Sequence, residues 1–478
     1  MQGEFNGDFT RDTHHPLKRF SRVLMQQGRV LLDADWNEQT SIVLHYLRSL
    51  AADLIGPHGG PPGQFEIKAP IGSTDFAISE GRYYVNGLLC ENRKRLDTTG
   101  VATEFTYFNQ PHYPFAEGTK ELSKDKGRFL AYLDVWERHI TFLADEDPKH
   151  DEPSIREVAL GGPDTASRAQ VVWQVRLLDL EGRTESDTDL AKVLADFKEF
   201  QTLLMKKGLL RPGTGKLSAR ARKPRTEGDD CACVTSPESR YRGVENQLYR
   251  VEIHKPGVAG VATFKWSREN GSVVFRIRKP IDTSDAETTT VALSDLGRDA
   301  RFGLKKGDWV EIVDDDYILM QNQSEPLLKV HTINHDERTV TLCGVPGNNM
   351  GRNLEKHPLL RRWDHRGDSQ SGGLTINKED GAAFVQSGPG EKGWLHLEDG
   401  VEIQFSLPDK ATYQTGDYWL IPARVATGNV EWPGSKEHPE PLPPHGIEHH
   451  YAPLAVLPEI VDRKITKDIV SLRKPISI

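Results

Sequence analysis

The sequence predicts a mainly β protein, with several small β-barrel or β-sandwich modules in tandem, an N-terminal helix and one internal helix. Three observations support this fold class. Stretches such as FAISEGRYYVNGLLCE and RFLAYLDVWERHITFL alternate β-branched or aromatic residues with polar ones, as half-buried strands do. The tight-turn dipeptides Asn86-Gly87 and Asn270-Gly271 adjoin or separate such stretches and predict hairpins. Two stretches carry the three-and-four apolar spacing of an amphipathic helix.

The first of these helices is predicted to begin after Asp35. Asp35 and Glu38 have the spacing of a capping box, and Gly56-Pro57 ends the helix. The apolar residues form a heptad-like stripe, which Thr40 completes: Trp36, Val43, Leu47, Leu50 and Leu54. Two roles are open for this stripe. It packs on the β domain that follows, which is the more common arrangement, or it forms a helical seam with a neighbouring subunit.

Composition shifts divide the chain into six units, because 478 residues exceed the size of a single core. The predicted units are an N-terminal arm and helix (1–62), a β domain (63–182) with a long excursion at 144–165, a helix and basic linker (183–235), a second β domain (236–365) that includes a small barrel at 302–345, a third β domain (366–457) and a tail (458–478). We expect the excursion and the tail to provide contact surfaces, although the tail could equally end free in solvent.

The internal helix is predicted near residues 187–207. Its stripe comprises Leu190, Val193, Phe197, Phe200 and Leu204. Beyond it, the stretch 211–225 holds six basic residues without an acid or an aromatic. Because sites for single-stranded nucleic acid usually interleave stacking aromatics, we predict a flexible linker, or an arm that docks on an acidic neighbour, and no nucleic-acid partner.

Composition excludes several classes of protein. The net charge of −9 is modest for this length and gives no general affinity for polyanions. The first residues are polar, and no apolar run reaches the ~20 residues of a membrane span. We therefore expect synthesis in the cytosol without a signal peptide and no direct membrane span. Four cysteines (Cys90, Cys231, Cys233 and Cys343) do not suggest a disulfide scaffold, and we interpret them as buried free thiols.

The motifs of common enzymes are missing from the sequence, which holds neither a nucleophile elbow nor a His-Glu-x-x-His helix. We predict no catalytic residues, no metal site and no cofactor. One alternative stays open, a carbohydrate-binding module or a glycosidase-like β protein, since paired carboxylates meet only in three dimensions. Its other support is aromatic residues near hairpins, which more often belong to the β core. These are Trp266, Trp309, Trp394, Trp419 and Trp432.

Long strings spread over most of the chain also resemble a known family. They are RVLMQQGRVLLDADWNEQ, HYLRSLAADLIGPHGG, AYLDVWERHIT, REVALGGPDTASRAQVVWQVR, YRGVENQLYRVEIH, TFKWSRENGSVVFRI, HPLLRRWD and GDYWLIPAR. The family is an uncharacterised bacterial one, met in phages and in gene clusters of phage-tail-like contractile injection systems. A fainter similarity, confined to the arginine-, glutamine- and glycine-containing part of the first string, is to phage baseplate and tail-fibre attachment proteins.

This resemblance implies a structural or adaptor component of a contractile injection particle, at the baseplate or a cage around it. The implied partners are baseplate, spike or sheath components and further copies of the chain. The particle itself could be intracellular, membrane-associated or released. We expect strong subunit contacts in the N-terminal segment, with Arg19, Arg22 and Arg29 as ion-pairing residues. The predicted interaction residues also include Asp33, Asp35, Trp36, Val43, Leu47, Leu50 and Leu54.

Overall fold

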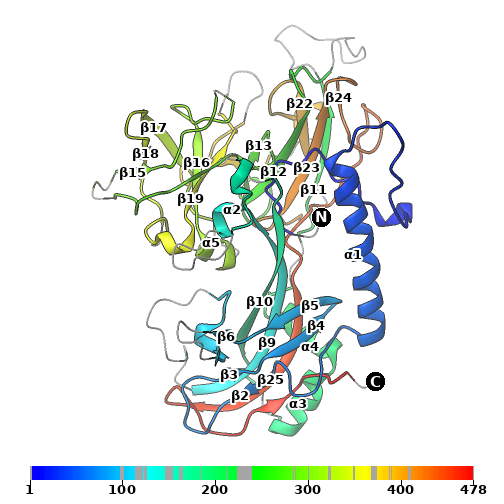
Figure 1. Cartoon of the computed structure of the whole chain (residues 1–478), viewed down its shortest axis with the longest axis vertical. Coiled ribbons are helices and arrows are strands. Elements are labelled where there is room, and N and C mark those ends of the chain that lie inside the picture. The colour runs from blue at the N-terminus through cyan, green and yellow to red at the C-terminus, as the bar shows by residue number, and fades with distance from the viewer. Residues whose placement is uncertain are drawn as a thin grey trace.

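The computed structural model describes most of the chain. The described residues are 3–96, 102–113, 122, 126–145, 154–160, 165–183, 185–210, 213–222, 240–283, 285, 287–299, 301–320, 324–347, 350–367, 374–386, 388, 390–406 and 411–476. They form seven antiparallel sheets and few helices, so the mainly β prediction is confirmed. Figure 1 shows a lower sheet, an upper sandwich and a curled sheet beside it, with helix α1 along one edge.

The lower sheet contains the longest strands of the chain. These are β9 (Lys126–Ile140), β10 (Arg168–Asp179) and β25 (His450–Val461), in the order β10-β9-β25-β26, with β27 also on β25. Val135 on β9 lies opposite Trp173 on one side and His450 on the other. Both faces of this sheet are covered, and β9 is accordingly buried over a continuous run rather than at alternate residues.

Small hairpins cover one face of the lower sheet and two short helices cover the other. The hairpin strands are β1 (His58–Gly59), β2 (Ile67–Lys68), β3 (Ala77–Ile78), β4 (Gly81–Val85), β5 (Leu88–Asn92), β6 (Arg95–Leu96), β7 (Ala102–Thr103) and β8 (Phe105–Thr106). Side chains of β2, β3, β4 and β5 form one core with β9, β10 and β25. Helices α3 (Asp187–Ala195) and α4 (Phe197–Lys206) pack on the opposite face.

The prediction of a single internal helix near 187–207 is therefore wrong, because the chain forms two helices there. Asp196 separates them in an extended conformation (φ −72°, ψ 115°). Its carboxylate accepts hydrogen bonds from the backbone N–H groups of Lys198 and Glu199, which caps α4. Asp is a favoured residue at helix starts. Asp196 can therefore begin a new helix, although the apolar stripe continues on both sides of it.

The upper sandwich combines two sheets around one core. The first sheet has the order β20-β13-β12-β23-β24 and the second β11-β22-β21. Their strands are β11 (Lys216–Ala221), β12 (Gln247–Lys255), β13 (Thr263–Ser267), β20 (Ala383–Phe384), β21 (Leu395–His396), β22 (Val401–Ser406), β23 (Tyr418–Arg424) and β24 (Asn429–Val430). The expected flexible basic linker is thus partly a strand. Within it, Arg220 is buried, pairs with Glu402 and stacks on Trp394.

The curled sheet has the order β14-β19-β16-β17-β18-β15 and encloses its own core. Its strands are β14 (Val274–Arg276), β15 (Thr288–Ala292), β16 (Trp309–Val313), β17 (Leu328–Asn334), β18 (Thr339–Cys343) and β19 (Leu359–Trp363). A bridge between Ile277 and Leu293 links its two edges, which makes a half-barrel. The barrel predicted at 302–345 therefore needs strands on both sides of those bounds. The short helices α2 (Phe142–Asp145) and α5 (Asp315–Met320) lie between the half-barrel and the lower sheet.

A buried ion-pair network joins the half-barrel to the sandwich. Lys265 on β13 lies 2.7 Å from a carboxylate oxygen of Glu311 on β16 and 3.3 Å from one of Glu252 on β12. Trp363 and Tyr317 also donate hydrogen bonds to Glu311. Burial alone would raise the pKa of Glu311, but nearby cations, led by Lys265, lower it to about 2. Glu311 is thus a buried carboxylate held ionised by its partners.

The two predicted turns have different outcomes. Asn86 and Gly87 have φ of 48° and 79° and connect β4 to β5, so this hairpin is confirmed. Asn270 and Gly271 also have positive φ, 50° and 68°. However, β13 and β14 on either side of them belong to different sheets, so the predicted hairpin there is wrong. The dipeptide specifies a tight reversal but not the partner of the strand that follows.

Strand pairing also crosses the predicted domain boundaries. The segment 366–457 supplies strands to both sheets of the sandwich and, through β25, to the lower sheet. The predicted tail contains β26 (Lys464–Ile465) and β27 (Val470–Ser471), which pair with β25 of its own chain. Alternation of apolar residues shows that a segment is a strand, whereas its partner depends on contacts hundreds of residues away.

The cysteines are only partly as predicted. Cys90 is buried, but Cys343 is exposed, so the interpretation as buried thiols is wrong for it. Cys231 and Cys233 lie outside the described residues. A separate finding concerns the helices: within the described ranges, none combines the length and the apolar character that crossing a membrane requires.

One pH dependence follows from the junction between β9 and the N-terminus. The rings of Phe5 and Phe9 contact His139 at centroid distances of 6.2 and 6.0 Å. Burial lowers the pKa of His139 from 6.5 to about 4. Between these values the unfolded chain binds a proton that the folded chain does not, so His139 lowers the free energy of unfolding as the pH falls from 6.5 to 4, by up to roughly 3 kcal/mol.

We expect His139→Phe to reduce this loss, because phenylalanine keeps the ring contacts and cannot be protonated. The measurement is the urea midpoint at pH 7.5 and at pH 5 for the full chain. The exposed His335, changed to Phe, is the matched control and should keep the wild-type dependence. Equal losses in His139→Phe and the wild type would show that this histidine does not titrate in the fold.

Candidate functional site

Helix α1 (Asp33–Ile55) runs along one edge of the molecule, beside the sandwich and the lower sheet (Figure 1). All 23 of its residues are described, and the buried ones among them are Ala34 and Ile42. A long helix normally buries an apolar stripe against its own domain. This helix instead leaves most of its surface in solvent, so its anchoring and its outer face need separate accounts.

The start of α1 differs from the predicted capping box. The helix begins at Asp33, three residues before the predicted first residue Trp36, and Asp35 lies half-buried within its first turn. Glu38 accepts a hydrogen bond from the Thr13 hydroxyl instead of reaching back along the helix. Asp33 accepts bonds from the N–H and the hydroxyl of Thr10. The capping box is wrong because Glu38 binds the preceding arm instead of reaching back to the helix start.

These contacts also set the charge of Asp33. Its partial burial would raise the pKa, but hydrogen bonds, led by the two from Thr10 and followed by those from the backbone of Ala34 and Asp33, lower the pKa below its usual 3.8. An ionised carboxylate in the first turn interacts favourably with the helix dipole. Asp33 therefore ties the arm to the helix start and is not a free group on the surface.

The inner side of α1 is held by a few strong contacts. Arg48 donates two hydrogen bonds to the carboxylate of Glu137 on β9, at 2.9 and 2.7 Å. At Gly87 a Cβ would lie 2.2 Å from the Arg48 carbonyl oxygen, so the hairpin turn needs glycine both for this approach and for its positive φ. Lys474 donates to the carbonyl of Ile55 at 3.1 Å. The helix is thereby fixed from one side.

The outer side of α1 carries the predicted apolar stripe. The expectation that the stripe packs on the following β domain is wrong, since every stripe residue is exposed. The exposed fractions are 78% for Trp36, 46% for Val43, 57% for Leu47, 56% for Leu50 and 78% for Leu54. The side of the helix that faces the protein carries other residues, such as Ala34, Ile42 and Arg48. The structure therefore leaves an ordered heptad-like stripe without a partner in the described part of its own chain.

The arm before α1 extends this exposed surface. Val23 donates a backbone hydrogen bond to the Gln39 side chain, and the rings of His14 and His45 lie 6.0 Å apart, which holds the arm near the helix. Its large exposed apolar side chains are Leu17, Phe20, Leu24, Met25, Val30, Leu31 and Leu32. We call these residues and the α1 stripe the N-terminal surface. Large apolar side chains exposed in such number on a helix and the segment held beside it usually mark an interaction site.

The three arginines predicted to form ion pairs lie on this arm. Arg19, Arg22 and Arg29 are all exposed, and none forms an ion pair with another described residue. The structure does not bring them together with an acidic partner, so their role in subunit contacts stays a prediction. They leave three cations beside the apolar surface.

The first residues of the chain were missed by sequence reasoning. Tyr418 donates to the carbonyl of Gly3, and the Asn270 side chain donates to the carbonyls of Phe5 and Gly7. Asn6 is buried. This segment lies between β9 and the sandwich and anchors the arm from its beginning. No periodicity in these polar and glycine-rich residues indicates burial; the two aromatic residues Phe5 and Phe9 were the available hint.

The other two predicted contact regions have different outcomes. The tail pairs with its own chain, as described above. The excursion at 144–165 lies partly outside the described residues, which there are 144–145, 154–160 and 165. In its described part, Leu160 is 66% exposed. The excursion therefore stays a prediction as a contact surface.

The aromatic residues considered for carbohydrate binding have other positions. Trp266 and Trp419 are almost fully buried in the sandwich core, which confirms the core interpretation for both. Trp309 stacks on His365, and Trp432 donates its ring N–H to the Glu440 carbonyl. With Trp394 stacked on Arg220, each tryptophan has a partner within the protein.

Two carboxyl groups between the sandwich and the half-barrel have raised pKa values. Burial is the largest influence on Glu269 and Glu398 and raises the pKa of each to about 7, against the lowering effect of Arg268. Arg268 donates to Glu398 at 2.8 Å and Arg301 to Glu269 at 2.7 Å. Carboxyl groups with raised pKa values also occur in glycosidase sites. Here, however, arginine partners on both carboxylates indicate an internal ion-pair network.

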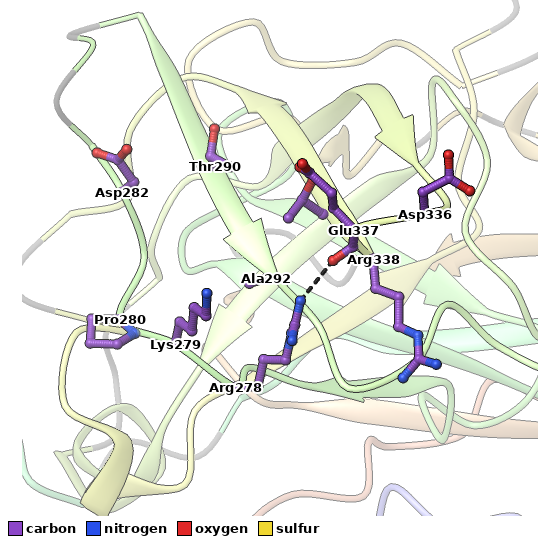
Figure 2. Close-up of a pocket in the computed structure, with 10 residues that line it drawn as sticks. Arg278, Lys279, Pro280, Asp282, Thr290, Ala292, Asp336, Glu337 and Arg338 are labelled. Atoms are coloured by element: carbon purple, nitrogen blue, oxygen red, sulfur yellow. Dashed lines mark hydrogen bonds between the residues drawn. The ribbon is translucent and has the colours of Figure 1, made fainter.

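A pocket of about 560 Å³ lies elsewhere, on the half-barrel (Figure 2). Its lining residues are Arg278, Lys279, Pro280, Asp282, Thr290, Ala292, Asp336, Glu337, Arg338 and Thr339. Arg278 donates to the carbonyl of Glu337 at 2.7 Å, and Arg338 to that of Ser294 at 3.0 Å. Three cations and three acids, all exposed, face this space, which gives it no preference for one class of ligand.

The structure thus defines a β-rich protein of several antiparallel sheets whose most distinctive surface is an exposed N-terminal helix and arm. The chain belongs to a family of unknown function, DUF6519, whose model matches residues 5–208 and 209–463. No curated protein and no solved structure matches the chain.

The anchoring of α1 generates a testable prediction. Replacement of Arg48 by Ala should release the middle of the helix and raise amide hydrogen exchange across α1, because its bidentate partner Glu137 is on the rigid strand β9. A double-mutant cycle with Glu137→Gln measures the pair itself, for which we expect about 1–3 kcal/mol of coupling in urea unfolding. Additive effects of the two changes would mean that the pair does not hold the helix.

Proposed function

We propose that the chain is a structural or adaptor subunit of a phage-tail-like contractile injection particle, placed at the baseplate or in a cage around it. In this role it acts through contacts with neighbouring subunits and not through chemistry. The observation that carries the proposal is the N-terminal surface, an ordered helix and arm whose large apolar side chains lie in solvent.

Two further features support this role. The helix is held by specific contacts on its inner side, so the outer stripe is presented in a fixed orientation. The sequence strings that resemble a family from contractile injection gene clusters include RVLMQQGRVLLDADWNEQ, which contributes much of this surface. Surfaces that are fixed and apolar bind partners with little loss of conformational entropy.

The alternative function, a carbohydrate-binding module or a glycosidase-like protein, has less support. It required aromatic side chains available on a sheet and acids in a cleft. Two of the five tryptophans are in the core. Glu269 and Glu398, the two carboxyl groups with raised pKa values, accept hydrogen bonds from arginines. We therefore keep the structural role as the conclusion.

The proposal is tested by sedimenting tail-like particles from cells that carry the gene cluster and probing for the tagged full-length chain. We expect the wild type to co-sediment and Leu31→Asp to lose at least most of this association, because Leu31 on the arm is 75% exposed and would lie in a contact. Ile71→Asp, at a 65% exposed position away from the arm and α1, is the matched control and should co-sediment.

The two variants should have the same unfolding midpoint, since both replace exposed residues. Absence of the wild-type chain from purified particles would overturn the proposal. Equal association of Leu31→Asp and Ile71→Asp would remove the arm from the contact.

A further inference from the structure

We infer that α1 packs against α1 of a second copy of this chain, as an antiparallel two-helix seam about a twofold axis. The inference deepens the proposed function and rests on it for its biological meaning, but it concerns contact between identical chains rather than contact with the particle. It follows from the spacing of the stripe, the neutrality of its flanks, the positions of nearby charges and the area available.

The stripe has the spacing of a coiled-coil seam. Trp36, Thr40, Val43, Leu47, Leu50 and Leu54 alternate at four and three residues, which are the a and d positions of a heptad. The Thr40 hydroxyl donates to the Trp36 carbonyl at 3.2 Å within its own helix. The seam can therefore bury the Thr40 methyl group without leaving an unpaired donor.

An antiparallel arrangement pairs residues of unequal size in each layer. With the axis near the middle of α1, Trp36 meets Leu54 of the second copy, Thr40 meets Leu50, and Val43 meets Leu47. Leu44 and Tyr46, which are 39% and 54% exposed, flank the centre and meet their own counterparts. The most apolar part of the face thus lies on the axis, as an isologous contact requires.

The flanking positions are nearly uncharged, which favours a copy of the same helix as the partner. They are Asn37, Gln39, Leu44, Tyr46, Ala51 and Asp53. Coiled coils that select a different chain usually do so with charges at these positions. Asp53 is the single charge, and an antiparallel seam places it opposite Gln39 of the other copy.

That placement brings a cation to Asp53. Val23 donates its backbone N–H to Gln39 at 2.8 Å, so the arm runs beside this end of the helix and Arg22 adjoins the contact. In the antiparallel pair, the second copy's Asp53 approaches the Gln39 region, where Arg22 has no ion-pair partner in the described part of its own chain. A parallel pair would instead bring the basic arms of both copies together, whereas the antiparallel register separates the two Gln39 positions, beside which the arms run, by roughly 21 Å, about two Debye lengths at 0.1 M salt.

The area is sufficient for a stable dimer. Complete burial of the exposed parts of the stripe, Leu44 and Tyr46 removes roughly 500–800 Å² from each copy, close to the ~800 Å² per partner of standard interfaces.

The first experiment measures the mass of the purified full-length chain by light scattering, without particles present. We expect twice the chain mass of 53.7 kDa. Leu47→Asp should raise the dissociation constant by roughly 100-fold or more, because it places a carboxylate in a central apolar layer of each copy. Ser49→Asp adds the same charge at an exposed position of the same helix outside the stripe, and it should leave the mass unchanged.

The second experiment tests the orientation by disulfide cross-linking, in a background with Cys231, Cys233 and Cys343 changed to Ser. Leu44→Cys should cross-link two copies efficiently, because it lies near the antiparallel axis. Trp36→Cys should not, since the two positions 36 are then separated by roughly 27 Å along the seam. The reverse pattern would overturn the antiparallel arrangement.

The ion pair gives a third, independent readout. Asp53→Lys should weaken the dimer by roughly tenfold at low salt, and Arg22→Asp in the same chain should restore it. If the double variant dimerises no more tightly than Asp53→Lys, the contact between Arg22 and Asp53 is overturned.

These outcomes separate the inference from the proposed function. A wild-type monomer that still co-sediments with particles, or a dimer that Leu47→Asp leaves intact, overturns the helix seam and leaves the structural role standing. A wild-type dimer that Leu47→Asp dissociates supports the seam, whether or not the chain joins a particle. Failure of the chain to join a particle would overturn only the proposed function.

Discussion

The pairing of β9 with β25 is the constraint on which the rest of the structure depends. It joins residues 126–140 to residues 450–461, so the chain between them must leave the lower sheet, build the sandwich and the half-barrel, and return. Closing so long a loop costs conformational entropy that grows only slowly with its length. The cost is offset by a sheet that is buried on both faces, with hairpins on one side and α3 and α4 on the other.

Strand β9 also connects the lower sheet to the candidate interaction surface. Near its end, Glu137 binds Arg48 of α1, and His139 contacts the aromatic rings at the chain start. The N-terminal segment therefore has two fixed ends, one between β9 and the sandwich and one at α1. Both of these attachments are made to β9. The arm and the helix therefore keep a defined orientation, although most of their side chains face solvent.

Within the upper part, the buried charges have a different role from the exposed apolar residues. Lys265, Glu311 and Glu252 pair at the junction of the sandwich and the half-barrel, where loss of one partner would leave an uncompensated buried charge. Such a network favours one relative placement of the two units. Buried ion pairs thus join the sandwich to the half-barrel, whereas the outer face of α1 leaves large apolar side chains exposed.

The sequence by itself determined the fold class, the Asn86-Gly87 hairpin, and the existence and spacing of the α1 stripe, because each depends on local periodicity or on backbone preference. It could not decide which strands pair, that Asn270-Gly271 joins two sheets, or that Asp196 divides the internal helix. It also could not decide which way the α1 stripe faces. Amphipathic spacing is the same for a helix that packs inward and for one that packs on a neighbour, and the contacts of Arg48, Ile42 and Ala34 turn the stripe outward.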